Sequence, residues 1–174
     1  RDLSFAFANE ISNMCEDLEV DSKRLIEQVN YEYPRSNIAL PSPGVGGYCL
    51  TKDPIIYSNP SKKLSSKPKS GSFSREINEH AAKSPYRSLI KFSRSNKLKL
   101  SDLNILVIGI AFKGFPKTDD HRFSTGVDFC DSIQNKVKNL WVKDFEIGSK
   151  KVNQLGYKNL VSIEKADAIF ILNN

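Results

Sequence analysis

The sequence has few cysteines and histidines, and each shortage excludes a class of protein. Its three cysteines are odd in number and irregularly spaced, which argues against a disulfide scaffold and favours a reducing compartment such as the cytoplasm. Two histidines with such scattered thiols cannot form a zinc site, so we expect no metal. No apolar run approaches the roughly 18 residues of a membrane-spanning helix, so we expect no membrane partner.

The composition is otherwise that of an ordinary globular protein. The 174 residues are 39% hydrophobic and 26% charged, enough for one average domain or two small ones. A net charge of +6 fits an anionic partner, and a nucleotide, nucleic acid and plain solubility all remain open. We expect no nucleic-acid partner, because no basic ridge is interleaved with aromatic residues. The basic cluster at 61–69 is rich in serine and proline and is typical of a solvated loop.

The first half of the chain has helical periodicity on either side of a long loop. Apolar residues three or four positions apart predict a helix over 1–18 that is buried on more than one side: Leu3, Phe7, Ile11, Met14 and Leu18. Asp21 is suited to cap a second short helix. Prolines and glycines predict a loop without long regular elements over 31–60, and its embedded apolar residues indicate that it is ordered. Ser72 or Ser74 can begin a further helix, which Pro85 breaks or restarts.

The second half alternates between strands and helices. Strands are expected at 105–109, 140–144 and 168–172, with helices at 124–139 and 149–155. This order predicts a parallel sheet with right-handed crossovers. Three strands are half of a doubly wound domain, so we expect the chain to be part of a longer protein. The fold class is α/β overall, with an all-α domain over 1–98 and a truncated Rossmann-like domain over 99–174.

The segment 41–54 (PSPGVGGYCLTKDP) carries the most chemistry. Three glycines within four residues let the backbone approach a ligand closely. Cys49 follows them, and Lys52 and Asp53 stand three and four residues further on. A nucleophilic thiolate requires a nearby cation and a group that moves protons. The residues alone leave two interpretations open, a reactive thiol and a small buried hydrophobic residue.

Four segments resemble one known family. They are 1–10 (RDLSFAFANE), 33–37 (YPRSN), 41–54 and 109–124 (GIAFKGFPKTDDHRFS). Together they are similar to the UDP-glucose/GDP-mannose dehydrogenase family, and most of all to its branch that oxidises UDP-N-acetylmannosamine or UDP-N-acetylglucosamine. The resemblance implies a central helical dimerisation domain with a catalytic-cysteine loop, followed by part of a UDP-binding domain. The family's N-terminal NAD-binding domain has no counterpart here, so we expect the chain alone to be inactive.

The resemblance also implies a role for individual residues. It makes Cys49 the nucleophile and Asp53 the group that positions or activates water. It implies that Lys52 and Arg122 contact NAD. It assigns contacts with the UDP-sugar to five further residues: Arg1, Arg35, Asn37, Gly46 and Lys113. The implied parent enzyme is a homodimer that converts a sugar CH₂OH to a carboxylate with two NAD⁺. The alternative is that the isolated chain is a non-catalytic dimerisation and UDP-binding module.

Overall fold

The computed structural model describes residues 1–59, 68–159 and 162–173. These residues form two compact units, Arg1–Ala82 and Lys83–Asn174, and each is considered by itself. The division falls before the expected boundary at residue 98, because Leu89 of helix α5 (Ser84–Ser95) is fully buried in the core of the second unit. Most of the basic cluster at 61–69 lies outside the described residues.

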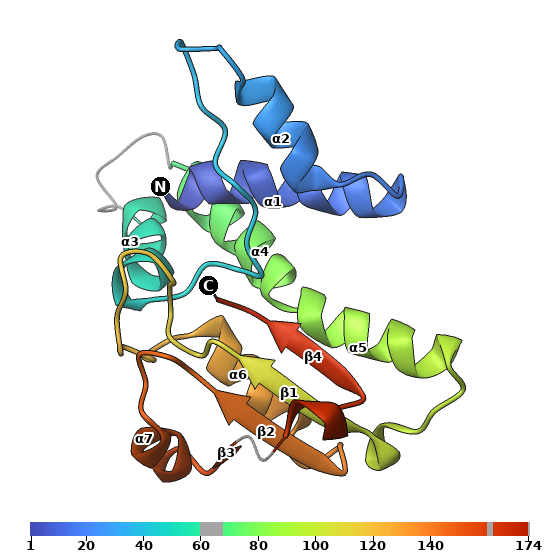
Figure 1. Cartoon of the computed structure of the whole chain (residues 1–174). Helices are drawn as coiled ribbons and strands as arrows, with labels where there is room; N and C mark the ends of the chain where they lie inside the picture. The colour runs from blue at the N-terminus through green and yellow to red at the C-terminus, as the bar shows by residue number, and fades with distance from the viewer. Residues whose placement is uncertain (60–67, 160–161, 174) are drawn as a thin grey trace. The chain divides into compact units, whose positions relative to one another are not determined.

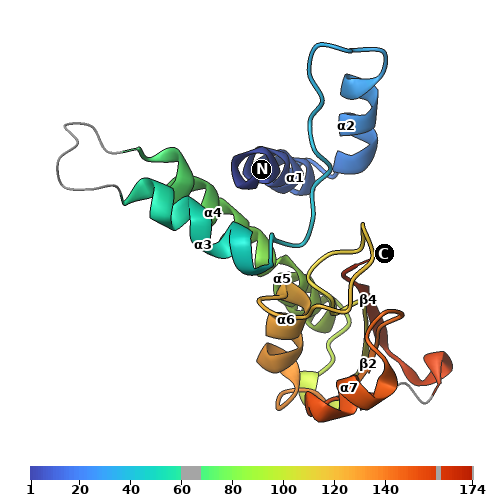
Figure 2. The same ribbon diagram turned by 90° about the vertical axis from the view of Figure 1, so that its left-hand side faces the viewer.

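The described part of the first unit is helical. Its elements are α1 (Asp2–Asp17), α2 (Ser22–Asn30), α3 (Tyr48–Ser58) and α4 (Ser70–Ala82). Helix α4 packs against both α1 and α3 (Figures 1 and 2). Helix α2 begins as predicted, because the side chain of Asp21 accepts a hydrogen bond from the backbone N–H of Arg24. Residues 31–47 have no helix or strand, as the sequence predicted.

Helix α1 differs from its prediction in the face that it buries. Its apolar stripe is exposed: Leu3 by 54%, Phe7 by 54%, Met14 by 64% and Leu18 by 70%. The buried face instead carries small and polar side chains, among them Asp2, Ala6 and Asn9. The expectation of burial on more than one side was therefore wrong for this chain. Small residues allow α4 to approach closely, and α4 supplies polar partners for the buried polar groups.

Helix α3 corrects the prediction that the loop continues to residue 60. Gly47 precedes the helix with a φ of 89°, a backbone conformation that a residue with a side chain rarely adopts. Pro54 lies inside the helix and has no N–H for the carbonyl of Leu50. That carbonyl instead accepts a hydrogen bond of 2.8 Å from Nη1 of Arg75 in α4. A contact distant in sequence thus offsets the cost of the internal proline.

The second unit is a small parallel α/β structure. After α5 its main elements are β1 (Asn104–Ile108), α6 (Thr125–Ile133), β2 (Asn139–Lys143), α7 (Ser149–Gln154), β3 (Lys158–Asn159) and β4 (Ala168–Ile171). The four strands lie in the order β3-β2-β1-β4 and all pairs are parallel. The parallel sheet and the α/β class are confirmed. The sequence missed β3, which has only two residues, and extended α6 beyond its end at Ile133.

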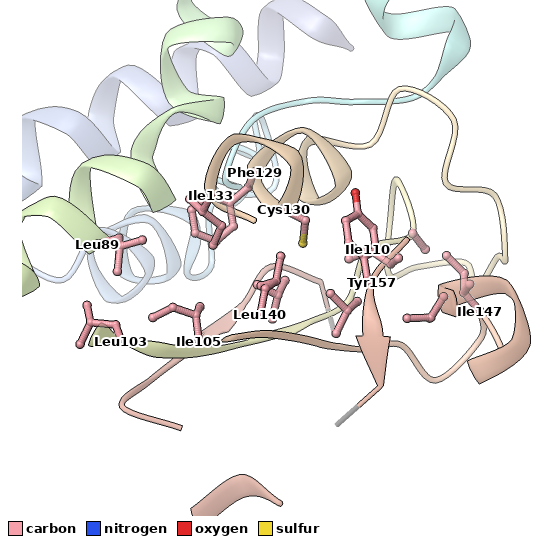
Figure 3. Close-up of a cluster of buried hydrophobic side chains, with 14 residues drawn as sticks. Leu89, Leu103, Ile105, Ile110, Phe129, Cys130, Ile133, Leu140, Ile147 and Tyr157 are labelled. Atoms are coloured by element: carbon pink, nitrogen blue, oxygen red, sulfur yellow. The ribbon is translucent and has the colours of Figure 1, made fainter. Parts of the chain in front are cut away.

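The core of the second unit lies on one face of this sheet. The register places Ile105, Leu140 and Ala168 side by side, and their side chains point to the same face. Figure 3 shows Phe129, Cys130 and Ile133 of α6 above Ile105 and Leu140. Burial raises the pKa of the Cys130 thiol, so this cysteine is an inert core residue.

Candidate active site

Cys49 is the second residue of α3 and its side chain is exposed. The other two cysteines, Cys15 and Cys130, are buried, and none of the three is paired in a disulfide. The structure therefore favours the interpretation of Cys49 as an accessible thiol over that of a buried hydrophobic residue. The first turn of a helix also favours negative charge, because its backbone N–H groups point outward.

Lys52 and Asp53, which follow Cys49 in α3, are also exposed. The ammonium of Lys52 donates a hydrogen bond of 2.7 Å to Oδ1 of Asp53. This bond raises the pKa of Lys52 above its ordinary value, and the charge of the same carboxylate adds to the effect. The ammonium also lies 5.3 Å from the centre of the Tyr48 ring. The start of α3 thus carries a thiol, a cation and a carboxylate that solvent and ligands can reach.

The predicted substrate residues of the first unit have different settings. Arg35 and Asn37 are exposed and line one surface depression of about 590 Å³. The Asn30 side chain joins the two ends of the segment 30–38, because it donates one hydrogen bond of 2.8 Å to the backbone of Ile38 and accepts another of 2.8 Å from it. Arg1 is exposed at the N-terminus of α1, and Gly46 is buried in the glycine-rich loop. The depression brings together Arg35 and Asn37, and its lining does not include Cys49.

Lys113 and Arg122 lie on one loop of the second unit, between β1 and α6. The backbone N–H of Phe112 donates to the carbonyl of Asp120 at 2.9 Å, which joins the two arms of this loop. The Arg122 guanidinium grips the Asp120 carboxylate with two bonds, Nε to Oδ1 at 2.9 Å and Nη2 to Oδ2 at 2.8 Å. These bonds lower the pKa of Asp120 to about 2. Lys113 is half-buried, with its ammonium 5.3 Å from the Phe112 ring.

The end of the same loop is a helix cap. Ser124 is the N-cap of α6, and its hydroxyl accepts a hydrogen bond of 3.1 Å from the N–H of Gly126. The helix expected from residue 124 therefore begins at this cap. The cap fixes the point at which the loop enters α6, and with it the backbone that carries Arg122.

Asp144 directly follows β2, and the sequence analysis did not identify its role. Its Oδ2 accepts backbone N–H groups of Ile110 at 2.7 Å and Ala111 at 3.0 Å. Its Oδ1 accepts those of Glu146 at 2.9 Å and Ile147 at 2.8 Å. Four donors occupy the carboxylate, so Asp144 holds together the ends of β1 and β2. An acidic residue at the end of a predicted strand was the available signal.

The first unit also contains a buried polar cluster that the sequence analysis did not single out. Its side chains come from α1 and α4, and all are at most 4% exposed: Asp2, Asn9, Ser74, Arg75 and Asn78. The signal was present in the sequence, because Asp2 and Asn9 stand seven positions apart on one helix face together with Ala6. Among the residues that the structure describes, no group of three or more potential metal ligands lies close together. No helix in the described ranges has the length and hydropathy needed to cross a bilayer.

The two units together define an α/β protein in which a helical unit presents a cysteine beside a glycine-rich loop, and a parallel sheet presents a basic loop. Residues 1–80 match the model of the UDP-glucose/GDP-mannose dehydrogenase family, central domain. The chain belongs to this family.

Relatives named for their activities match most of the chain. It is 36% identical over 133 residues to the UDP-N-acetyl-D-mannosamine dehydrogenase of Campylobacter jejuni. This match covers 74% of this chain and 29% of that protein. It is 30% identical to the NDP-N-acetyl-D-galactosaminuronic acid dehydrogenase of Ralstonia nicotianae, over 99% of the chain and 39% of that protein.

A solved structure gives the same result for the fold. The UDP-D-ManNAc dehydrogenase of Pyrococcus horikoshii superposes with a TM-score of 0.78 at 30% identity, over 99% of this chain and 39% of the other. The chain thus spans less than two fifths of the length of each of these relatives.

Proposed function

We propose that this chain is part of an NAD-dependent nucleotide-sugar 6-dehydrogenase that oxidises the C6 alcohol of a UDP-hexose to a carboxylate. The proposed substrates are UDP-N-acetylmannosamine and UDP-N-acetylglucosamine, because the named relatives act on N-acetylhexosamine nucleotides. The observation that carries the proposal is the setting of Cys49, exposed at the start of α3 with Lys52 and Asp53 beside it.

Cys49 supplies the nucleophile for the second oxidation. Removal of a hydride and a proton from the alcohol gives an aldehyde at C6. The Cys49 sulfur adds to this carbon, and the resulting thiohemiacetal carries a hydrogen that can leave as a second hydride. NAD⁺, for which Lys52 and Arg122 are the proposed contacts, would supply the hydride acceptor for both oxidations. The product on Cys49 is a thioester, which has the oxidation level of the final acid.

Asp53 completes the reaction by hydrolysis of the thioester. Its exposed carboxylate can orient a water molecule and accept one of its protons as the water oxygen attacks C6. The carbon–sulfur bond then breaks, and the thiolate of Cys49 is regenerated with release of the carboxylate. In the free chain the Asp53 carboxylate is paired with the ammonium of Lys52. An anionic ligand that binds Lys52 would compete with this pair and weaken the hold of Lys52 on the carboxylate.

Cations of both units are suited to bind the phosphates of the two ligands. Lys52 and Arg122 are exposed and have the charge that the pyrophosphate of NAD requires. For the UDP-sugar we propose contacts with Arg1, Arg35 and Lys113. Arginine suits this role because its planar guanidinium can bind a phosphate with two hydrogen bonds. Asn37 is exposed beside Arg35, and Gly46 offers a backbone without a side chain to the sugar.

We also propose that the parent enzyme is a homodimer formed through the helical unit. The exposed stripe of α1 supports this, because four large apolar side chains on one helix face are costly to leave in water. Three unpaired cysteines support a cytoplasmic location, where thiols stay reduced.

The test is an assay of the full-length parent enzyme against a panel of UDP-sugars with NAD⁺. We expect an N-acetylhexosamine nucleotide to give two NADH per uronate, and Cys49→Ser to abolish net formation of the acid. A Cys49→Ser enzyme with unchanged production of acid would contradict the mechanism. The isolated chain should reduce no NAD⁺, and turnover by it would contradict its assignment as a fragment.

A second candidate is that the isolated chain is a non-catalytic dimerisation and UDP-binding module. The exposed apolar stripe of α1 and the exposed guanidinium of Arg35 favour this interpretation. Calorimetric titration with UDP, together with the mass in solution, tests it. Binding of UDP by a dimer without reduction of NAD⁺ supports the module, and absence of binding rejects it.

A further inference from the structure

The buried polar cluster of the first unit is centred on an ion pair. Nη1 of Arg75 donates to Oδ1 of Asp2 at 2.9 Å, and both side chains are only 5% exposed. Ser74 donates to the other oxygen of Asp2 at 2.8 Å, and Asn78 donates to Oδ1 at 2.9 Å. Contacts between α1 and α4 thus hold the Arg75 guanidinium in place independently of its contacts with other segments.

Arg75 extends from this cluster to the glycine-rich loop. Both of its terminal nitrogens donate to the carbonyl of Val45, Nη1 at 3.2 Å and Nη2 at 3.3 Å. Nη1 also donates to the carbonyl of Leu50 at 2.8 Å. Val45 and Leu50 lie on either side of Cys49 in the sequence, so one buried guanidinium holds the backbone before and after the thiol.

The carbonyl of Leu50 is an acceptor because of Pro54. In a regular helix this oxygen would receive the N–H of the residue four positions later, and proline has none. Arg75 supplies the missing donor. The sequence therefore contains two residues that match each other across the fold, a proline that leaves an acceptor and an arginine that occupies it.

We propose that Arg75 is a positioning residue for Cys49. It fastens the segment from Val45 to Leu50 so that the sulfur is presented to the sugar carbon in a fixed place. The proposal rests on the proposed function only for the role of Cys49, since the contacts of Arg75 are independent of it. Lysine cannot replace Arg75 fully, because its single ammonium lacks the planar fork that reaches two carbonyls and a carboxylate together.

The test compares Arg75→Lys with a matched control, Ser74→Ala. Lysine retains the positive charge beside Asp2, so this variant avoids an unpaired buried carboxylate. Ser74 is buried in the same cluster and bonds Asp2 and Gly71, but it donates no hydrogen bond to the loop. A third variant, Pro54→Ala, restores a backbone N–H opposite the carbonyl of Leu50.

Kinetics of the full-length enzyme give the first readout. We expect Arg75→Lys to lower kcat about tenfold with KM changed less than about threefold, because a displaced nucleophile slows the chemical steps more than binding. Ser74→Ala should leave kcat unchanged. Adding Pro54→Ala to Arg75→Lys should recover part of the lost kcat, because the new N–H again serves the carbonyl of Leu50. Loss of kcat in the control, or no recovery in the double variant, would overturn the proposal.

Hydrogen exchange of the 174-residue chain gives the second readout, and it does not depend on activity. Peptides that cover 44–54 should exchange about tenfold faster in Arg75→Lys, while peptides of α1 keep their protection. Unchanged exchange at 44–54 overturns the proposal even if kcat falls. If instead Cys49→Ser still forms acid, the proposed function fails, and the exchange experiment still decides whether Arg75 holds this segment.

Discussion

The ammonium of Lys52 lies 2.7 Å from Oδ1 of Asp53, so the residue proposed to face the cofactor is paired with the one proposed to activate water. Both side chains are about half exposed, at 45% and 57%. A pair of this kind contributes little to the stability of a fold, because solvent screens it. Its importance is chemical, since a ligand that binds Lys52 changes the surroundings of Asp53.

The titration of Lys52 should report this pair directly. The hydrogen bond to Asp53 raises the pKa of Lys52 above 10.5, and Asp53→Asn should return it toward that value. The pair favours the protonated lysine, so it is present at neutral pH and is lost as the pH rises through the raised pKa. The ¹³Cε shift of Lys52 measures this. The control is Glu27→Gln, which removes the partner of Lys23 in another exposed pair and should leave the pKa of Lys52 unchanged.

Asp53→Asn should also separate the two halves of the proposed reaction. Formation of the thioester requires Cys49, whereas its hydrolysis requires the Asp53 carboxylate. We expect the rate of acid release to fall about 10²- to 10⁴-fold, with an acyl group held on Cys49. Mass spectrometry of a digest detects this adduct, and Cys49→Ser is the control that should show none. Release of acid at the normal rate would remove Asp53 from the mechanism.

The Arg122–Asp120 pair predicts a response to acid. The pKa of Asp120 is lowered to about 2 from 3.8, chiefly by the hydrogen bonds of Arg122. Because folding lowers this pKa, the stability that the ion pair contributes is complete above about pH 4 and is lost as the pH falls through 2. Carboxyl ¹³C shifts should place the midpoint of Asp120 near 2, and Arg122→Gln should raise it toward 3.8, with the backbone N–H of residue 122 still lowering it. An unchanged midpoint in that variant would show that Arg122 is not the cause.

Local patterns in the sequence were sufficient for the second unit. A continuous apolar run predicted β1, and alternating elements predicted a parallel sheet, because each of these signals depends on neighbouring residues. The two-residue strand β3 escaped, since so short a run has no period. The capping role of Asp21 was also readable, because its side chain and the N–H that it binds are three residues apart.

The first unit was less readable because its decisive contacts are distant in sequence. Pro54 predicted a loop, whereas in the structure a donor from Arg75 serves the carbonyl that the proline leaves without a partner in the helix. The stripe on α1 predicted a buried face, yet α4 packs against the polar side that contains Asp2. The residues of the candidate site, by contrast, came from motif resemblance, and the structure adds the exposure of Cys49 and the pairing of Lys52 with Asp53.

Gly71 should be indispensable to the packing of α4 against α3. A Cβ at this position would lie 2.6 Å from the hydroxyl oxygen of Ser58 and closer still to the carbonyl oxygen of Pro54. Alanine normally favours a helix over glycine by about 1 kcal/mol, but overpacking costs about 1–3 kcal/mol. We expect Gly71→Ala to be destabilising in urea denaturation. The control is Gly148→Ala, where nothing lies within 4 Å, so its effect should stay within about 0.5 kcal/mol.

The exposed stripe on α1 should decide the oligomeric state. Phe7→Glu places a charge in the middle of the proposed dimer interface, where burial without a partner is costly. In the isolated chain Phe7 is 54% exposed, so the same change should leave the fold of the monomer intact. Light scattering after size exclusion should show the mass of a dimer for the parent sequence and of a monomer for Phe7→Glu. Phe145→Glu, at a side chain 75% exposed in the second unit, is the control and should remain dimeric. A monomeric parent, or a dimeric Phe7→Glu variant, would exclude α1 as the interface.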